Sequence, residues 1–293
     1  MINPFMEDEK DDLVDKSLVQ SVIEGSQESL EALVKRHQGW IYNIALRMFR
    51  DADDAEDATQ DILIKMITKL STYQSKSAFR TWLYRIVKNH ILNMKKGYRE
   101  AMNKGFKPFA KNLDNAIDQD LPDDKSLPVE KAILVEETKI GCLTAMLLCL
   151  DREQRLIFIF SEIFEVSDTL GSQIFEMSKD NFRKKLSRAR KQLVNFISKK
   201  CGLIDKENPC RCEKKTKAFM DAGYVDPDNR IFTNDYIHKV RELSRQRSKT
   251  LEPMFDKEYT ALYREHPFQS PPDYIGLLRK VMNNSDFKRT FDL

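Results

Sequence analysis

Apolar residues recur every three or four positions through most of this chain, which is the spacing of one face of an α-helix. Between residues 17 and 50 the stripe is interrupted at Gly25 and Ser26, so the pattern predicts two helices, the first of them short. A third stripe, ILIKMITKL, follows the segment DADDAEDATQD at 51–61. These acidic residues fit the first turns of a helix, where the helix dipole favours negative charge.

Charge is segregated along the chain, although the net charge is only +3. Segment 51–61 holds six acids and no base, more than a helix dipole requires, and this predicts a surface offered to a basic partner. Segment 78–96 holds five basic residues and no acid, and residues 179–200 hold nine basic residues and one acid. Basic faces of this kind are typical of nucleic-acid binding.

The basic segment AFRTWLYRIVKNHILNMKK, at 78–96, follows a polar loop, STYQSKSA, and is predicted to be helical to about Tyr98. An apolar stripe at Leu83, Ile86, Val87 and Ile91 leaves the basic residues to project from other faces. Cations track phosphates and aromatic rings stack on exposed bases, so the segment suits single-stranded nucleic acid. The alternative for Trp82 is that it anchors the helix in the core, and both interpretations stay open.

A second basic helix is predicted at the end of the segment 151–193. The pattern indicates a helix from Asp151, a short helix from Ser167, a break near Glu176 and Met177, and a helix capped by Ser178. Apolar residues give the last helix an inner face, and its polar residues form an outer one. This is the construction of a helix-turn-helix whose last helix enters the major groove of DNA. A membrane surface or a solvated face is the alternative.

Between these two regions the helical pattern decays. Residues 101–128 contain Gly105, Pro108, Pro122 and Pro128, with five acids and no base from 112 to 124, and are expected to be a flexible, anionic linker. Beyond residue 200 the chain is expected to be helical in pieces, at 234–251, 256–265 and 272–282. With only nine glycines and no β-rich segment, the fold class predicted is all-α.

Composition excludes several other classes. We expect no membrane association, because no apolar run approaches the ~18 residues that a spanning helix needs, and no signal peptide is visible. The location expected is cytoplasmic. We find no phosphate-binding glycine loop, GxSxG or HExxH motif, so no enzymatic activity is predicted. His37 and His90 fall within helical patterns and are read as packing or surface residues.

Together the motifs resemble the bacterial RNA polymerase sigma factors of the extracytoplasmic-function (ECF) class, over residues 30–96 and 127–200. DAEDATQDILIKMITKL (54–70) is similar to the family's segment that docks on the clamp helices of polymerase. FRTWLYRIVKNHILNMKK (79–96) looks like the segment that melts and reads the minus-ten element. SKDNFRKKLSRARKQL (178–193) looks like the recognition helix for the minus-thirty-five element. Three such motifs in order are far more specific than any one of them.

The resemblance implies roles for individual residues. Core polymerase would contact Asp54, Glu56, Asp57, Gln60 and Asp61. The single-stranded minus-ten element would contact Tyr73, Arg80, Trp82, Arg85, Lys88, Asn89 and Asn93, with the loop 73–77 capturing a flipped base. The duplex minus-thirty-five element would contact Ser178, Lys179, Asn181, Arg183, Lys184, Lys185 and Arg188. The implied partners are core RNA polymerase and promoter DNA, with an anti-sigma factor as a further candidate.

Two departures from the family pattern stand out. The helix-turn-helix of the family has a small residue in its second helix and a glycine in its turn, whereas here Gly171 comes early and Phe-Glu-Met occupies the turn. Either the alignment slips by one residue or the turn is unusual. In addition, Asn93 stands where the family has an acidic residue.

Cysteines raise a separate question in the region after residue 200. Cys201, Cys210 and Cys212 suit zinc if a fourth ligand such as His238 joins them. Nearby cations could instead lower a thiol pKa and make a redox sensor, and ordinary packing is the third reading. Cys142 and Cys149 lie in an apolar helical stretch and are read as core residues. No cofactor is otherwise expected.

The predicted organisation has four parts: a region-two domain at 1–100, the linker at 101–128, a helix-turn-helix region-four domain at 129–200, and an extension at 201–293. The function expected is promoter-specific transcription initiation with core RNA polymerase. The alternative is a helix-turn-helix regulator that binds DNA without polymerase. The acidic segment 51–61 separates these two hypotheses, because only the first needs it.

Overall fold

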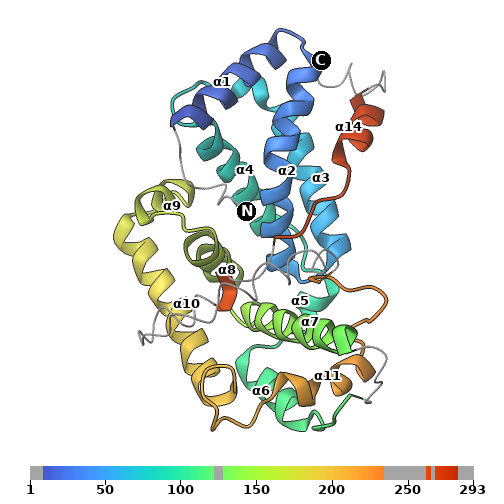
Figure 1. The fold of residues 1–293 in the computed structure, drawn as a ribbon. Helices are drawn as coiled ribbons and strands as arrows, with labels where there is room; N and C mark the ends of the chain where they lie inside the picture. The colour runs from blue at the N-terminus through green and yellow to red at the C-terminus, as the bar shows by residue number, and fades with distance from the viewer. Residues whose placement is uncertain (1–8, 122–127, 234–261, 265–267, 283–293) are drawn as a thin grey trace.

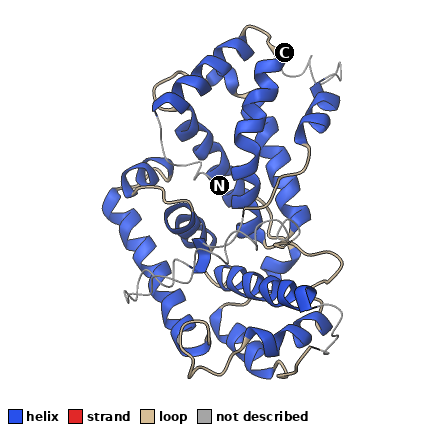
Figure 2. Cartoon of the chain, viewed as in Figure 1, coloured by secondary structure: helices blue, strands red, loops and turns tan. Residues whose placement is uncertain are grey.

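The structure is a computed structural model that describes residues 9–121, 128–233, 262–264 and 268–282. These parts of the chain are helical, with loops between the helices and no strand, which confirms the all-α prediction for them (Figure 2). The one pairing of extended backbone that they show is an isolated bridge between Cys201 and Cys210.

Four helices form the N-terminal half: α1 (Glu9–Ile23), α2 (Gln27–Phe49), α3 (Ala52–Thr68) and α4 (Phe79–Asn93), shown in Figure 1. Side-chain caps set two of their starts: Ser26 accepts from the Ser29 N–H, and Asp51 accepts from the Asp54 N–H. A 3₁₀ turn, Leu70–Thr72, precedes the loop to α4. The first helix was expected only from about residue 17, and its acidic first turns were missed.

Two predictions around the linker are wrong. The basic helix α4 ends at Asn93 rather than near Tyr98, and a short helix, α5 (Tyr98–Met102), follows. The predicted linker also contains α6 (Phe106–Asn115). Its apolar positions recur at helical spacing, and Phe106 and Phe109 both stack on Phe196, with ring centroids 5.3 and 5.6 Å away. Contact with that distant ring stabilises a helix that its own sequence signals only weakly.

The C-terminal half contains α7 (Pro128–Leu147), α8 (Arg152–Phe158) with a π-helical turn (Ile159–Ile163), α9 (Asp168–Ile174) and α10 (Lys179–Lys200). Beyond them lie α11 (Cys212–Asp221), which was not predicted, and α14 (Tyr274–Met282), which falls within the predicted segment 272–282. The predicted segment 234–251 lies outside the described residues, as does most of 256–265.

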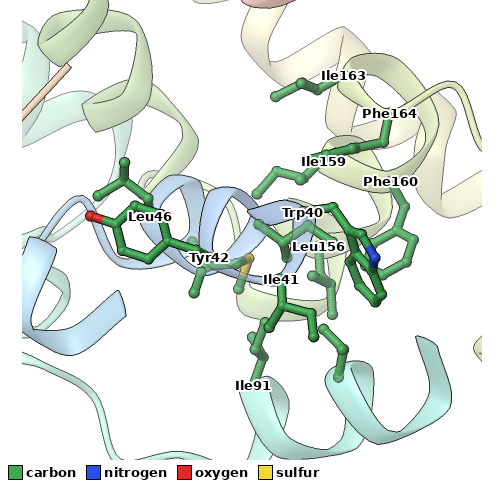
Figure 3. Close-up of a cluster of buried hydrophobic side chains, with 14 of the residues drawn as sticks. Trp40, Ile41, Tyr42, Leu46, Ile91, Leu156, Ile159, Phe160, Ile163 and Phe164 are labelled. Carbon is green, nitrogen blue, oxygen red and sulfur yellow. The ribbon is translucent and has the colours of Figure 1, made fainter. Parts of the chain in front are cut away.

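One continuous apolar core joins the two halves. Figure 3 shows side chains of α2, among them Trp40 and Ile41, facing Leu156 of α8 and Phe160 of the π-helical turn, with Ile91 of α4 beside them. Tyr84 of α4 meets Phe160 edge-on at 5.8 Å between ring centroids. The DNA-binding elements predicted for the two halves are therefore packed together.

A cluster of buried charged residues stabilises the contact between the two halves. Arg152 and Arg155 of α8 both bind the carboxylate of Glu100 in α5, at 2.6 and 3.2 Å. Arg155 also donates to the carbonyl of Met48 at the end of α2, and Arg152 donates to the carbonyls of Ile91 in α4 and Lys95 just beyond it. These two arginines hold Glu100 ionised, so its pKa falls below the usual value against the opposing effect of burial.

The C-terminal segment returns along the N-terminal half, where α14 lies beside α2 and α3 (Figure 1). The backbone of Gln269 exchanges two hydrogen bonds of 2.8 Å with the Asn43 side chain in α2. Arg279 forms a bidentate ion pair with Glu31, with N–O distances of 2.6 and 2.7 Å. The extension thus contacts both halves of the molecule.

Candidate polymerase and nucleic-acid interfaces

Helices α9 and α10 form the predicted helix-turn-helix. Ser167 and Ser178 cap them, accepting from the Leu170 and Asn181 N–H groups. Gly171 in α9 is the small residue of this motif, because an added Cβ would come within 2.3 Å of the Phe182 ring. The turn itself uses Glu176 in the left-handed region, at φ 55°. The turn is therefore unusual in its residue type and regular in its conformation.

The outer face of α10 is exposed and basic. Phe182, Leu186 and Ala189 are buried, whereas Asn181, Lys184 and Arg188 point to solvent. Lys179 and Arg183 are exposed too and pair with Asp168 of α9 at 3.2 and 2.5 Å. Of the remaining predicted contacts, Ser178 is the cap of the helix and Lys185 is half-buried beside Glu153 of α8. This face has the charge and exposure that a duplex phosphate backbone requires.

The predicted minus-ten residues of α4 divide into two groups. Asn89 and Asn93 are exposed and Arg85 is half-buried, but Arg80 and Lys88 are buried. Arg80 lies 3.2 Å from Asp11 and 3.4 Å from Asp15 of α1, and Lys88 donates to Glu176 at 2.8 Å. The expectation that these two cations project from an open face is wrong for this arrangement, because carboxylates of α1 and of the turn after α9 cover them.

Aromatic residues near the start of α4 form a stack. Trp82 is half-buried, with its ring centroid 5.4 Å from that of Phe79 and 5.7 Å from that of Tyr73. The Tyr73 hydroxyl donates to the Ser77 carbonyl at 2.7 Å and so braces the loop that precedes α4. Gln74, Ser75 and Lys76 at the tip of this loop are exposed. Trp82 therefore both packs on the core and presents a partly open ring.

The acidic surface lies on the N-terminal turns of α3. Asp57 and Asp61 are exposed, while Asp54, Glu56 and Gln60 are half-buried. Burial raises the pKa of Glu56, and the nearby Asp53 and Asp57 raise it further. The pKa of Asp54 rises for the same two reasons. Carboxylates that repel one another in this way are stabilised by a cationic partner.

Both helical histidines act in packing. His37 is fully buried, accepts from the Trp40 indole N–H at 3.1 Å and faces Asp15 at 3.3 Å. Burial lowers the pKa of His37, and burial also lowers that of His90, which lies between Lys65 and Asp61. Neither histidine is placed among metal-binding side chains within the described ranges.

The cysteines do not group in the structure as the sequence predicted. Cys142 lines a small pocket together with Cys201, Cys210 and Cys212, whereas Cys149 lies apart, beside Asn103. The interpretation of Cys142 as an ordinary core residue therefore missed its neighbours, which stand at least 59 positions further on (201 − 142). His238 lies outside the described residues.

Comparison with known proteins shows similarity to sigma factors. The family Sigma-70 region 2 matches residues 33–100. The RNA polymerase sigma-H factor of Pseudomonas aeruginosa is 37% identical over 82 residues, which is 27% of this chain and 42% of that protein. The ECF RNA polymerase sigma-E factor of Haemophilus influenzae is 26% identical over 190 residues, 63% of this chain and 96% of that protein. The E. coli K12 sigma-E factor is 36% identical over 81 residues, 42% of its length.

Two solved structures show more distant likenesses. CnrH in complex with the cytosolic domain of CnrY has a TM-score of 0.44 and 21% identity, covering 63% of this chain and 97% of that one. The sigma factor RpoE of Bartonella quintana, in complex with the anti-sigma factor NepR, has a TM-score of 0.38 and 19% identity, covering 57% and 96%.

The chain is thus similar to RNA polymerase sigma factors, including two of the ECF class. The region-two match runs from within α2 through α4, which carry the acidic surface and the basic aromatic helix, and the similarity to the sigma-E relative extends across 63% of the chain. The resemblance predicted from the sequence is thereby confirmed. No helix in the described parts of the chain is long and apolar enough to cross a membrane.

Proposed function

We propose that the chain binds core RNA polymerase and directs promoter-specific transcription initiation. The observation that carries this is the exposed basic face of α10 in a capped helix-turn-helix, in the same chain as a sigma-70 region 2. Acting with RNA polymerase, it works in the cytoplasm. No catalytic step belongs to it, because a sigma factor supplies specificity and polymerase supplies the chemistry.

Each of the surfaces described above has its own role in this proposal. The acidic turns of α3 bind polymerase, α4 and the loop before it read the melted minus-ten strand, and α10 reads the duplex minus-thirty-five element. Residues 1–100 and 129–200 form the two working units, 101–128 links them, and 201–293 is an extension. We also propose an anti-sigma factor as a partner, as the resemblance to the family implies.

In this arrangement the minus-ten face is partly covered. Lys88 is held by Glu176 in the turn after α9, so the part of α4 around Lys88 can meet a DNA strand only after this turn moves away. Extruding a base from the duplex costs a few kcal/mol as well. Polymerase binding must offset both costs, and the free chain should therefore bind promoter DNA weakly.

Transcription in vitro tests the proposal directly. The chain is added to core RNA polymerase on a genomic library, and the 5′ ends of the transcripts are sequenced. We expect starts that share upstream elements at two fixed spacings and that disappear without the chain. Start sites no more specific than those of core enzyme alone would refute the proposal.

Reversing the acidic surface separates the proposal from a regulator that works without polymerase. The double variant Asp57→Lys and Asp61→Lys should lose core binding, measured by co-elution with polymerase, because these carboxylates are exposed. The matched control reverses Glu207 and Asp228, two exposed acids of the extension. Equal core binding by both variants would favour the polymerase-independent alternative.

A further inference from the structure

Four cysteines from three segments of the chain meet at one pocket. Cys142 comes from α7, Cys201 ends α10, Cys210 lies in the following loop and Cys212 opens α11. Leu113 of α6 also lines this pocket. Both Cys142 and Cys201 pack with the main apolar core. The pocket therefore lies where the linker, the helix-turn-helix half and the extension come together.

The four thiols are mutual neighbours. Burial raises the pKa of Cys142, and Cys212, Cys210 and Cys201 each raise it further. The pKa of Cys212 rises to about 12 through burial and then through Cys201 and Cys210, and Cys210 is affected in turn by Cys201. Each of the six pairs within the group is thus close enough to interact electrostatically. Four cysteines that line one pocket provide the sulfur donors that a structural metal ion takes.

The backbone next to Cys201 packs closely against the backbone of Cys210. Gly202 donates to the Cys210 carbonyl at 3.0 Å, and a Cβ on Gly202 would lie 2.5 Å from that same oxygen. The N–H of Ile204 donates to the Cys201 carbonyl at 3.2 Å, and an isolated bridge pairs Cys201 with Cys210. The backbone thus holds these two cysteines next to each other at the pocket.

We propose that Cys142, Cys201, Cys210 and Cys212 form a four-thiolate site for a zinc ion. Four sulfurs are the donor set of closed structural zinc sites, in which the metal is tetrahedral with Zn–S distances of about 2.3 Å. Zn²⁺ binds as the thiols release their four protons to solvent, with no change in oxidation state. In their present positions, no three His, Cys, Asp or Glu residues of the described ranges could hold a metal, so zinc binding requires the cysteine side chains to move closer together.

A redox sensor fits these residues less well. Sensor cysteines are exposed and have lowered thiol pKa values. Cys201 is buried, the other three are half-buried, and burial raises the pKa of all four. Lys139 lies at the pocket and can offset part of the negative charge of a zinc–tetrathiolate centre. Zinc here would fasten the extension to α7.

Metal analysis of the full chain tests the site. The protein is purified under reducing conditions, supplied with zinc sulfate, dialysed, and analysed by plasma mass spectrometry. We expect one zinc per chain, and Cys142→Ser should lose more than the roughly 10- to 100-fold in affinity that removal of an outer-shell partner costs. The matched control is Cys149→Ser, on the same stretch of chain and outside the pocket. It should keep the metal.

Two further measurements on the wild-type chain test the site even if a variant fails to fold. Cobalt added to the wild-type chain should give the intense thiolate-to-metal charge-transfer absorption of a tetrahedral sulfur site, and a mercurial should release zinc as four thiols react. Substoichiometric zinc in the wild type, unchanged affinity in Cys142→Ser, or a mass showing these cysteines joined as disulfides would overturn the assignment.

A separate observation concerns α14. Tyr274 and Leu278 are buried, and Leu278 and Ile275 line a pocket with Leu30 and Val34 of α2 and Ile67 of α3. Burial raises the pKa of Tyr274, and the carboxylate of Glu56 raises it further, so this tyrosine stands at the edge of the acidic surface. With the Arg279–Glu31 pair, α14 covers the groove between α2 and α3.

Resting on the proposed function, we infer that α14 and core polymerase compete for the surface formed by α2 and α3. Undocking α14 with Leu278→Asp should tighten core binding about tenfold, within the usual range for coupled sites. The matched control is Ile117→Asp, which places the same charge at an exposed apolar position. Equal affinities for wild type and Leu278→Asp would overturn this inference and leave the proposed function standing. Failure of both proteins to bind core would overturn both.

Discussion

Gly171 shows how strongly one residue constrains the helix-turn-helix. It faces Phe182, whose ring lies where a Cβ would need to be, so α9 approaches α10 closely only because the side chain is absent. The resulting contact fixes the angle at which α10 leaves the turn. Gly39 in α2 offers the opposite case, because nothing lies within 4 Å of its missing Cβ.

The two glycines should therefore respond oppositely to alanine. Gly171→Ala should lower the free energy of unfolding by about 1–3 kcal/mol through overpacking, whereas Gly39→Ala should raise it by about 0.5–1 kcal/mol through helix propensity. Urea unfolding followed by circular dichroism measures both. A neutral Gly171→Ala would show that α9 can shift away from Phe182 without cost.

His37 makes stability depend on pH. Burial lowers its pKa in the folded chain, so the unfolded chain takes up a proton first as pH falls below about 6.5. The stabilisation is full above that pH and is lost on acidification, and the lowered pKa values of Asp15 and Glu100 extend the loss to lower pH. We expect a smaller free energy of unfolding at pH 5.5 than at 7.5.

The matched variant is His37→Gln, which keeps a polar side chain and cannot become charged. Its free energy of unfolding should change less between pH 7.5 and 5.5 than that of the wild type, measured by urea titration at both values. Identical changes in the two proteins would assign the pH dependence to other groups.

At the scale of elements, the sequence predicted helix starts well wherever a side chain caps the helix. The cap residues Asp151, Ser167 and Ser178 correctly predicted where α8, α9 and α10 begin, because the capping signal is local. Helix α6 was missed because its stability comes from Phe196, which lies about 90 residues away. Its apolar positions became informative only once that partner was known.

The sequence predicted which residue types make up the candidate site, but it predicted only in part which of them are exposed. The outer face of α10 is as open as its pattern implied, since the spacing of Phe182, Leu186 and Ala189 alone determines it. In α4 the same reasoning failed for Arg80 and Lys88. Their partners, Asp11 and Glu176, lie 69 and 88 residues away (80 − 11 and 176 − 88), and no periodicity within a helix reports such distant carboxylates.

The contact between α4 and α9 can be weakened selectively. Glu176→Gln leaves the backbone of the turn unchanged and removes the charge that binds Lys88, whose side chain is only 8% exposed. We expect a loss of about 0.5–1 kcal/mol and faster amide hydrogen exchange in α4 and α9. Glu213→Gln, at an exposed position on α11, is the control. Unchanged exchange in both helices would show that apolar packing alone holds them together.

At the scale of the whole molecule, the continuous core implies that the two halves unfold together. Both tryptophans, Trp40 and Trp82, lie in the N-terminal half, whereas helices are spread over both. Tryptophan fluorescence and far-ultraviolet circular dichroism should therefore follow a single coincident transition in urea. Separate midpoints would mean that the halves are joined only loosely.

Arg155 offers a direct way to weaken the junction. It is buried between carbonyls of both halves and the Glu100 carboxylate. Arg155→Met should lower the free energy of unfolding by about 3 kcal/mol, because it breaks a buried ion pair and leaves carbonyls without donors. The exposed Arg188→Met on α10 should change it by no more than about 0.5 kcal/mol. A small effect of Arg155→Met would mean that Arg152 suffices to hold Glu100.

The position of α14 also sets an order of events during synthesis. About 200 residues separate the end of α3 from the start of α14. A ribosome adds roughly 5–20 residues per second, so α2 and α3 emerge roughly 10–40 s before the helix that covers them is made. Every newly made molecule thus passes through an interval in which this surface is open, and the nascent chain offers it before the finished chain covers it.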